Sequence, residues 1–485
     1  PISMIKIIIT AFAGLALVIN TCIIYYWRDT AFDPANSDLI SYLVILPMLI
    51  TALVLSPYFI FKAIQRYKAK KEEKLQQAAD FEHRPAENIS GEQKEKSTQS
   101  RQFALNIYSS AARHSFGENE SILEQYKQFK SPELDADLLN AYGLPVLSLR
   151  IQDLDDAVEA EDDDSIQLSR REKRIRQLIM HQLEQHADTL SAAAEHLKNS
   201  ARFYDNEMAY QYRMHPAWTG EHRAEDDFEE HAEKMAESIS RLNKLCIHIL
   251  LPESMIHHWH DESCARIQHL LAEQFSILLA QIEIKQHFVS HQTSYIEWLT
   301  LLEQIAQQEY VFNLIIGADS EIDQDWLDEK YWQSEQYIAA EYASSWCIAG
   351  LNTEISGLMP QKTLKIMLDE ASIESFLLKN QLQSHQQYQQ DEPFMLILDD
   401  ALNIKTSKQL QRKFANSLIE PHHFLYTHSS LGNTQQLAKI FSFMLGMHLT
   451  EELISMVFSI ELDHAYSFFE AYQEEKTDKE LLHSS

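Results

Sequence analysis

The sequence predicts an α/β domain that follows two transmembrane helices. Two almost uncharged apolar stretches occupy most of the first 61 residues. Beyond residue 102, short apolar runs alternate with segments of helical periodicity, the pattern of an α/β protein. Hydrophobic residues make up 45% of the 485 residues, enough to bury a large core. We therefore expect a two-helix anchor in residues 1–61, a charged tether in 62–102 and an α/β domain in 103–475.

The two apolar stretches, residues 5–27 and 39–61, each have the length that crosses ~30 Å of hydrocarbon as a helix. Only Lys6, near one end, is charged, and aromatic residues lie near the span ends, as membrane interfaces favour. The first stretch is longer than a signal-peptide core, lacks an A-x-A-like site and is closely followed by the second. The sequence therefore predicts two membrane passes and no cleaved signal.

Flanking charges predict the orientation of these spans. The loop in residues 28–38 carries one arginine and three aspartates, whereas residues 62–74 hold six lysines and arginines outside the second span. Basic segments stay on the cytoplasmic side. We expect a two-pass protein of a bacterial inner membrane, with both ends and the soluble domain in the cytoplasm.

The charge of the chain limits its partners. The net charge is −31, and the residues after position 80 hold 33 basic and 66 acidic side chains. Nucleic acid needs a basic face, so this excess argues against it. Of the four cysteines, Cys22 lies in a predicted span, and Cys246, Cys264 and Cys347 are far apart without CxxC pairing. This pattern indicates neither a disulfide framework nor a zinc site, and fits a reducing cytoplasm.

A helical insertion is expected at about residues 153–240. Its acidic start, residues 153–164, leads to Ser165 as a helix N-cap. The apolar residues that follow have roughly helical spacing, with charges on the other face. That stripe fits packing against the core, and a partner-binding surface is the alternative.

The remaining elements are predicted from apolar runs. We expect a helix over residues 264–285, a helical run after residue 406 and a helix from about Thr434. The strands are expected at residues 103–111, 244–252, 311–319, 342–350, 394–400 and 423–428.

Three segments resemble the thiolase-like fold of β-ketoacyl synthases: FALNIYSSAARHSFGENESILEQYKQFK, LEQIAQQEYVFNLIIGADSEID and THSSLGNTQQLAKIFSFML. The resemblance implies a layered α/β fold with a Cys nucleophile at a helix N-terminus and two His beside it. The nucleophile position falls at residues 291–294, where the text SHQTS has no cysteine. FMLILDDAL has no histidine where the first is expected, and His428 approximates the second.

The chain thus departs from the family at its reactive positions. Ten glycines in 485 residues is also far below average usage of about 7%, so the glycine turns of such sites are depleted. We expect a degenerate domain without catalytic residues. The candidates for a vestigial pocket are His428, Asp399, Cys246 and His291.

The two-pass layout is similar to an uncharacterised group of bacterial inner-membrane proteins associated with type VI secretion loci that carry lipase effectors. This resemblance implies an immunity or accessory role, with a lipase effector or a secretion-complex subunit as partner.

Other motifs add little chemistry. The run HHWHDES at residues 257–263 is rich in possible metal ligands, but consecutive residues point in different directions. Cys246 and His248 alternate on a strand, so they share a face in a mostly apolar run. Asp399 and Asp400 end a strand and would suit a cation, and no phosphate-binding glycine loop is present.

Three functional hypotheses stay open at this point. The first is a membrane-tethered, non-catalytic binding protein that needs no cofactor or metal. The second is a membrane-proximal acyl or lipid enzyme of altered chemistry, and the third is a structural subunit of an inner-membrane assembly.

Overall fold

The computed structural model separates the chain into two units, residues 1–96 and 97–485. It describes residues 100–160, 168–214, 239–331, 337–400, 403–427, 431, 437–449 and 454–473, together with residues 20, 21, 23, 25, 26 and 28. Within these ranges, no helix combines the length and the apolarity that a membrane crossing requires. Both predicted spans, apart from those few positions, and nearly all of the predicted tether lie outside the described residues.

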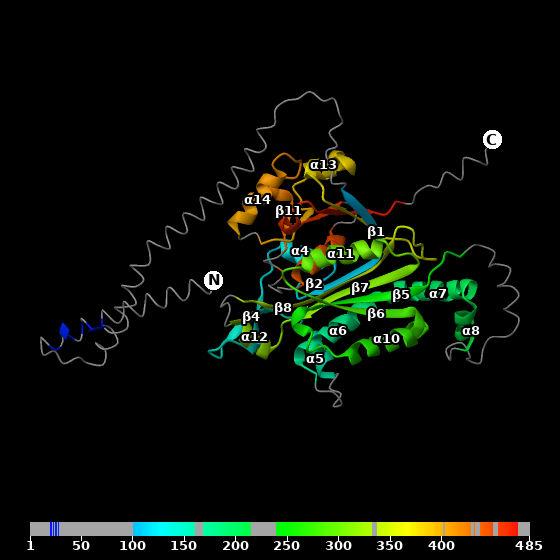
Figure 1. The fold of residues 1–485 in the computed structure, drawn as a ribbon, viewed down its shortest axis with the longest axis horizontal. Helices are drawn as coiled ribbons and strands as arrows, with labels where there is room; N and C mark the ends of the chain where they lie inside the picture. Colours follow the sequence, from blue (N-terminus) through cyan, green and yellow to red (C-terminus); the bar gives the residue numbers. More distant parts are fainter. Residues whose placement is uncertain are drawn as a thin grey trace, which may run out of the picture. The chain divides into compact units, whose positions relative to one another are not determined.

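The second unit is built on a mixed β-sheet whose main path holds ten strands (Figure 1). Its first half consists of β1 (Arg101–His114), β5 (Lys244–Pro252), β6 (Ile282–Val289), β7 (Val311–Ser320) and β8 (Ala339–Gly350). Its second half consists of β9 (Lys362–Leu368), β10 (Met395–Ile397), β11 (Phe424–Tyr426), β12 (Ser455–Phe458) and β13 (Tyr466–Ala471). The apolar runs predicted as strands all lie in this path.

The two halves repeat one topology. Counted along the chain, the strands of each half lie side by side in the order third, second, fourth, fifth, first. In each half the second strand is parallel to the third and fourth, and the fifth is antiparallel to the fourth and the first. The halves join through the antiparallel pair β1–β9. The domain is therefore an internal duplication, which no repeat in the sequence reveals.

Helices cover both faces of the first half. Alternate residues of β8 point to opposite sides. Trp346 and Ile348 face a core that includes α11 (Ser294–Ala306) and α15 (Ala438–Met444). Cys347 and Ala349 face a second core that includes α6 (Arg170–Gln185), α7 (Ala187–Tyr204) and α10 (Asp261–Phe275). Because both faces are covered, β5 and β7 are apolar along almost their whole length.

A third core covers the outer face of the second half. It includes side chains of α13 (Ile373–Lys379) and α14 (Ile404–Phe414), packed on strands β9 to β13. Close packing also explains one of the few glycines. A Cβ on Gly446 would lie 2.4 Å from Cε2 of Phe469, so only glycine lets the turn after α15 approach β13.

Where the structure describes it, in residues 153–160 and 168–214, the predicted insertion is largely helical, and it packs as part of the core. It forms α5 (Leu154–Ala160), α6, α7 and α8 (Asn206–Met214), and the apolar stripe of α6 and α7 is buried against the outer face of the first half. The core interpretation of that stripe is therefore confirmed. The cap of α6 is Ser169, which accepts a hydrogen bond from the backbone N–H of Glu172 at 3.1 Å. The predicted cap, Ser165, lies outside the described residues.

One predicted helix is wrong over its second part. The segment 264–285 was expected to be a single helix, but α10 ends at Phe275 and Ser276 takes a left-handed φ of 53°. Residues Ile282–Val289 then form β6, which lies at the edge of the main path and pairs only with β5. The helical pattern had no glycine to mark its end, because serine takes the left-handed position instead.

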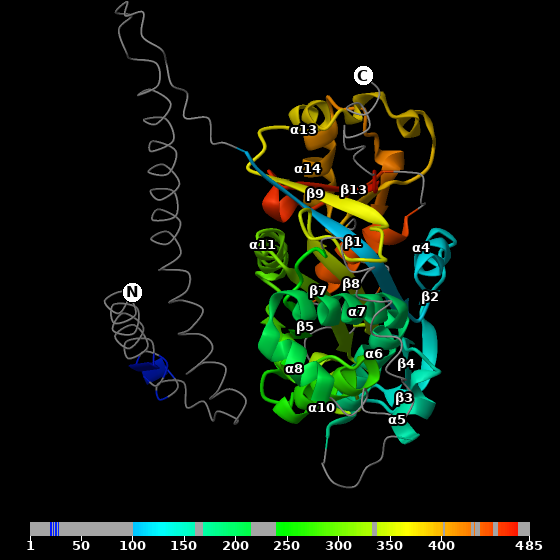
Figure 2. The same ribbon diagram turned by 90° about the vertical axis from the view of Figure 1, so that its right-hand side faces the viewer.

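Three shorter strands extend the first half. They are β2 (Gly117–Glu118), β3 (Glu133–Leu139) and β4 (Pro145–Leu149), with α4 (Glu120–Lys127) after β2. β1 pairs with β8 up to Tyr342, and β4 takes its place beside Ala339 and Ala340. The hairpin of β3 and β4 therefore continues the sheet where β1 ends, near α5 and α12 (Gln324–Tyr331) (Figure 2).

Candidate functional site

The candidate site is the start of α11, where the ketosynthase resemblance puts a nucleophile. The helix begins at Ser294 after a turn whose last residue, Thr293, donates its hydroxyl to Oε1 of Glu297 at 2.5 Å. Tyr295, Trp298 and Leu302 recur at helical spacing and are buried. The first residues of this helix are therefore held inside the domain by its apolar face.

Two hydroxyl groups at this helix start are buried without a partner. Oγ of Ser294 and the phenol oxygen of Tyr295 make no hydrogen bond within the described part of the chain. Burial, and then the negative charges of Asp399 and Glu461, raise the pKa of Tyr295. Among the described residues, no base accepts the proton of Ser294, whereas an activated serine nucleophile needs one.

Asp399 follows Leu398, which belongs to the same buried cluster as Tyr295 at this helix start. It follows β10 and accepts a hydrogen bond from the backbone N–H of Ile460 at 2.7 Å and another from Oγ of Ser459 at 3.2 Å. Burial raises the pKa of Asp399. Lys439 Nζ lies 4.0 Å from Oδ1 of Asp399 and also pairs with Glu461. The Asp399 carboxylate therefore holds the segment after β12 in place through these hydrogen bonds.

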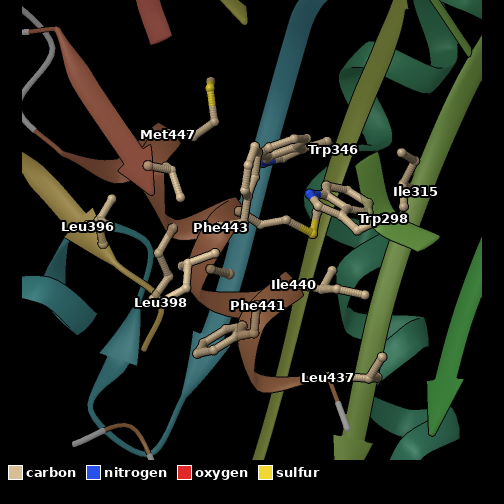
Figure 3. Close-up of a cluster of buried hydrophobic side chains, with 14 of the residues drawn as sticks. Trp298, Ile315, Trp346, Leu396, Leu398, Leu437, Ile440, Phe441, Phe443 and Met447 are labelled. Carbon is tan, nitrogen blue, oxygen red and sulfur yellow. The ribbon is translucent and has the colours of Figure 1, made fainter. Parts of the chain in front are cut away.

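Aromatic side chains fill the space below the start of α11 (Figure 3). The ring centroids of Trp298 and Trp346 are 5.7 Å apart, and each lies about 6 Å from Phe443, at 5.8 Å and 6.1 Å. Phe469 adds a further edge contact to Trp346 at 5.6 Å. α11 and α15 therefore meet through large, closely packed rings.

The segment that follows β11 is anchored by the first half. The backbone N–H of Phe116 donates to Nδ1 of His114 at 3.2 Å, so Nε2 carries the proton and donates to the carbonyl of Leu431 at 3.0 Å. Tyr126 donates its hydroxyl to the carbonyl of Tyr426 at 2.5 Å. His428 itself lies outside the described residues.

Cys246 lies at the opposite end of its strand from this site. It pairs in register with Glu283, near the start of β6, whereas α11 follows the end of β6 at Val289. Six residues of strand separate these positions, about 20 Å at roughly 3.3 Å per residue. The predicted shared face is present, with Sγ of Cys246 3.3 Å from Nε2 of His248. Burial raises the pKa of Cys246, which disfavours the reactive thiolate.

The other sequence candidates occupy separate places. His291 lies in the turn before α11, but its side chain is exposed. In HHWHDES, Nδ1 of His260 lies 2.9 Å from Oε2 of Glu172, and Trp259 is buried. Among the residues that the structure describes, no group of three or more His, Cys, Asp or Glu is placed to hold a metal ion.

Of the three candidates that the structure describes, Asp399 lies near the buried helix start, His291 is exposed in the turn before it, and Cys246 lies elsewhere. The sequence analysis missed Tyr295, Lys439 and Glu461. Tyr295 directly follows the expected nucleophile position and was within reach of that analysis. Lys439 and Glu461 are 22 residues apart in the chain, and no local pattern joins them.

Buried histidines make the stability of the domain depend on pH. Desolvation lowers the pKa of His114, His186, His248 and His448 from 6.5 to about 4. Between pH 6.5 and 4 these histidines are protonated in the unfolded chain but neutral in the folded chain. Their contribution to the free energy of unfolding is therefore complete above pH 6.5 and is lost as the pH falls towards 4. Each group contributes up to roughly 3 kcal/mol. We expect the thermal midpoint, followed by circular dichroism, to fall steadily between pH 7 and 5.

Glu321 acts in the opposite direction, because burial raises its pKa to about 8. Its stabilisation is present below the unfolded value of 4.5 and is lost as pH rises through 8. Replacing Glu321 with Gln should therefore steepen the loss of stability on acidification, and His448→Gln should flatten it. A profile that neither substitution changes would contradict this assignment.

Comparisons with known proteins give structural likeness alone. No protein-family model matches the sequence, and no curated protein matches it. The chain is similar to the ishigamide ketosynthase/chain length factor, at 10% identity and a TM-score of 0.37, over 76% of this chain and 98% of that chain.

Two further solved structures give similar values. For the ketosynthase from module 6 of the bacillaene synthase from Bacillus subtilis 168, the identity is 9%, the TM-score 0.38 and the coverage 78% and 75%. A variant of OleA from Xanthomonas campestris gives 9%, 0.31, 75% and 97%. At these TM-scores the likeness decides neither the activity nor the partners of this chain.

Proposed function

We propose that the chain is a membrane-tethered, non-catalytic binding protein with a degenerate thiolase-like domain. Its duplicated half-sheets, joined at β1–β9, supply the layered framework that the ketosynthase resemblance implies. The observation that carries the proposal is the start of α11. There the buried hydroxyls of Ser294 and Tyr295 have no partner among the described residues, and Trp298 of the same helix packs against the rings of Trp346 and Phe443.

The cysteines support the same proposal. Cys246, Cys264 and Cys347 are buried, and burial raises the pKa of each thiol, in Cys347 to about 12. A nucleophilic cysteine needs a stabilised thiolate, usually in a partly exposed and electropositive place. A protein that binds its partner stoichiometrically does not need a reactive thiol.

The proposal also names the class of protein partner. The resemblance to two-pass proteins of type VI secretion loci suggests a lipase effector or a secretion-complex subunit, bound at the inner membrane by an immunity or accessory protein. The acidic composition, with 66 acidic against 33 basic residues after position 80, favours a partner with a basic surface.

To test this, the full chain is solubilised in detergent and purified from its own cells, and mass spectrometry identifies the proteins that co-purify with it. We expect one protein partner at about one to one. The same partner should be recovered by the chain with Cys246, Cys264 and Cys347 all replaced by Ala, and by Asp399→Asn. These variants remove the candidate nucleophiles and the one candidate carboxylate near α11.

Thermal unfolding of each variant controls for folding. The proposal is wrong if the purified chain turns over acyl thioesters or lipids and the folded Asp399→Asn or triple-Ala variant loses that turnover. Such a result would favour the enzyme of altered chemistry.

A further inference from the structure

The β3–β4 hairpin exposes an unusual amount of apolar surface. Leu134 and Leu147 are partners across the two strands and point outward, with exposed fractions of 72% and 44%. Tyr142 and Leu144, in the turn between the strands, are 89% and 59% exposed. Clustered apolar side chains of this kind on a soluble surface mark interaction sites. The hairpin also projects from the end of the first half, where β1 stops (Figure 2).

An acidic cleft adjoins this hairpin. Its volume is about 690 Å³, and it lies between the end of β1, β2, the hairpin and the segment that leads into α5. Three cations line it, and two of these, Arg113 and Arg150, have side chains only 10% and 8% exposed. Its carboxylates are Glu118, Glu133, Asp135, Asp137, Asp153 and Asp155.

Six carboxylates line the cleft beside three cations, and of the six Asp155 also pairs with Arg174 from α6. Arg150 is shared among three carboxylates, with Nε 2.7 Å from Asp135, and Nη1 3.0 Å from Asp155 and 3.8 Å from Asp137. Arg113 is shared between Asp153 and Glu118. The buried guanidinium groups hold the cleft open in one shape, and the outer carboxylates remain accessible to solvent.

The end of the hairpin is fixed before any partner arrives. The side chain of Gln324 accepts from the backbone N–H of Leu139 at 2.9 Å and donates to its carbonyl at 2.8 Å. In the turn, Oδ1 of Asn140 accepts from the backbone N–H groups of Tyr142 and Leu144. A surface that is ordered in advance loses little entropy on binding, which favours affinity.

From these features we infer that the hairpin and the cleft together form a docking surface for a basic segment of a protein partner. The surface consists of the outward side chains Leu134, Tyr142, Leu144 and Leu147 and the carboxylates of the cleft. Lysine or arginine side chains of the partner enter the cleft, and neighbouring apolar side chains cover the hairpin. This inference rests on the proposed function and gives the chemistry of the partner.

Charge complementarity selects this occupant. An acidic segment would be repelled by the carboxylates of the cleft, and a purely apolar segment would bring no positive charge to them. A segment that alternates basic and apolar side chains satisfies both parts of the surface. Because the outer carboxylates are exposed, the binding weakens as added salt screens them.

The experiment uses the detergent-solubilised full chain and short fluorescent peptides, with binding followed by fluorescence anisotropy. We expect a peptide of alternating Lys and Leu to bind at least about tenfold more tightly than one of alternating Lys and Ser or Glu and Leu. Glu133→Gln with Asp137→Asn, and separately Leu134→Ser with Leu144→Ser, should each weaken binding by about tenfold.

Substitutions in the second half of the domain control for nonspecific electrostatic and hydrophobic binding. Asp391→Asn with Leu378→Ser removes one exposed carboxylate and one exposed leucine there and should leave the binding unchanged. Equal binding of all three peptides, or equal weakening by the control pair, would overturn the inference.

Co-purification with the variant chains distinguishes a failure of this inference from a failure of the proposed function. If the hairpin and cleft variants still recover the partner at about one to one, the docking surface is wrong and the binding function stands. If they lose the partner while the control pair keeps it, the docking surface is supported. Acyl turnover that depends on Asp399 would contradict the function, whatever the peptides show.

Discussion

Replacing Arg174 with Met is expected to lower the free energy of unfolding by about 3–5 kcal/mol. Arg174 and Glu341 have side chains with no exposed surface, and they form two hydrogen bonds of 2.8 Å and 2.7 Å. Glu341 also accepts from the backbone N–H of Ile151 at 2.6 Å and from Oγ of Ser320 at 2.9 Å. Without the guanidinium, the domain keeps a buried negative charge at the junction of α6, β7 and β8.

Chemical denaturation of the full chain, followed by circular dichroism, measures this effect. Adding Glu341→Gln to Arg174→Met removes the stranded charge. The amide oxygen still accepts from the backbone N–H of Ile151, and the Ser320 hydroxyl can turn to accept from the amide nitrogen, so the double variant should restore at least half of the loss. Arg170→Met is the matched control, because Arg170 begins the same helix but is half-exposed. We expect less than about 0.5 kcal/mol there. A similar loss for Arg170→Met and Arg174→Met would refute the role of burial.

Replacing Trp298 with Ala is the second large change, with an expected loss of about 3–5 kcal/mol. Trp298 is fully buried on α11 and contacts Trp346 and Phe443, which come from β8 and α15. Its removal leaves a cavity between the two halves, and the rigid rings around it cannot collapse to fill it. The loss should appear in the denaturation midpoint measured by circular dichroism.

Ile296→Ala on the same helix is the control for Trp298, because Ile296 is 45% exposed. It should cost less than about 1 kcal/mol. If Trp298→Ala leaves the free energy of unfolding unchanged, the ring contacts of Trp298 do not stabilise the packing between the two halves.

The sequence predicted the strands that are long apolar runs, and it missed the half-buried edge strand β6 and the buried strands β9, β12 and β13. β5, β7 and β8 are apolar runs because both faces of the sheet are covered, and such runs are visible without alignment. In β6, polar residues such as Glu283, Lys285 and Gln286 interrupt the apolar ones, and the segment was taken as the continuation of a helix. Edge strands carry weaker apolar patterns because one side of them faces solvent.

The candidate site was predictable only where it is local in the chain. The position at residues 291–294 followed from the helix before VFNLIIGAD, and α11 does begin there. The approach of Asp399 to Tyr295 joins residues about a hundred positions apart, and no spacing rule connects them. Cys246 and His248 are adjacent on a strand, so their contact was predictable, whereas their distance from α11 depends on strand direction.

The central place of β1 sets a time order for folding during synthesis. Both strands that flank it come much later in the chain, since Leu105 pairs with Gly350 and Arg101 pairs with Leu368. At about 5–20 residues per second, a ribosome needs roughly 10–50 s to supply them. For that interval β1 lacks both strands that flank it in the finished sheet. The newly made chain therefore needs a chaperone, or a slow collapse of its own first half, to keep this strand from pairing with another molecule.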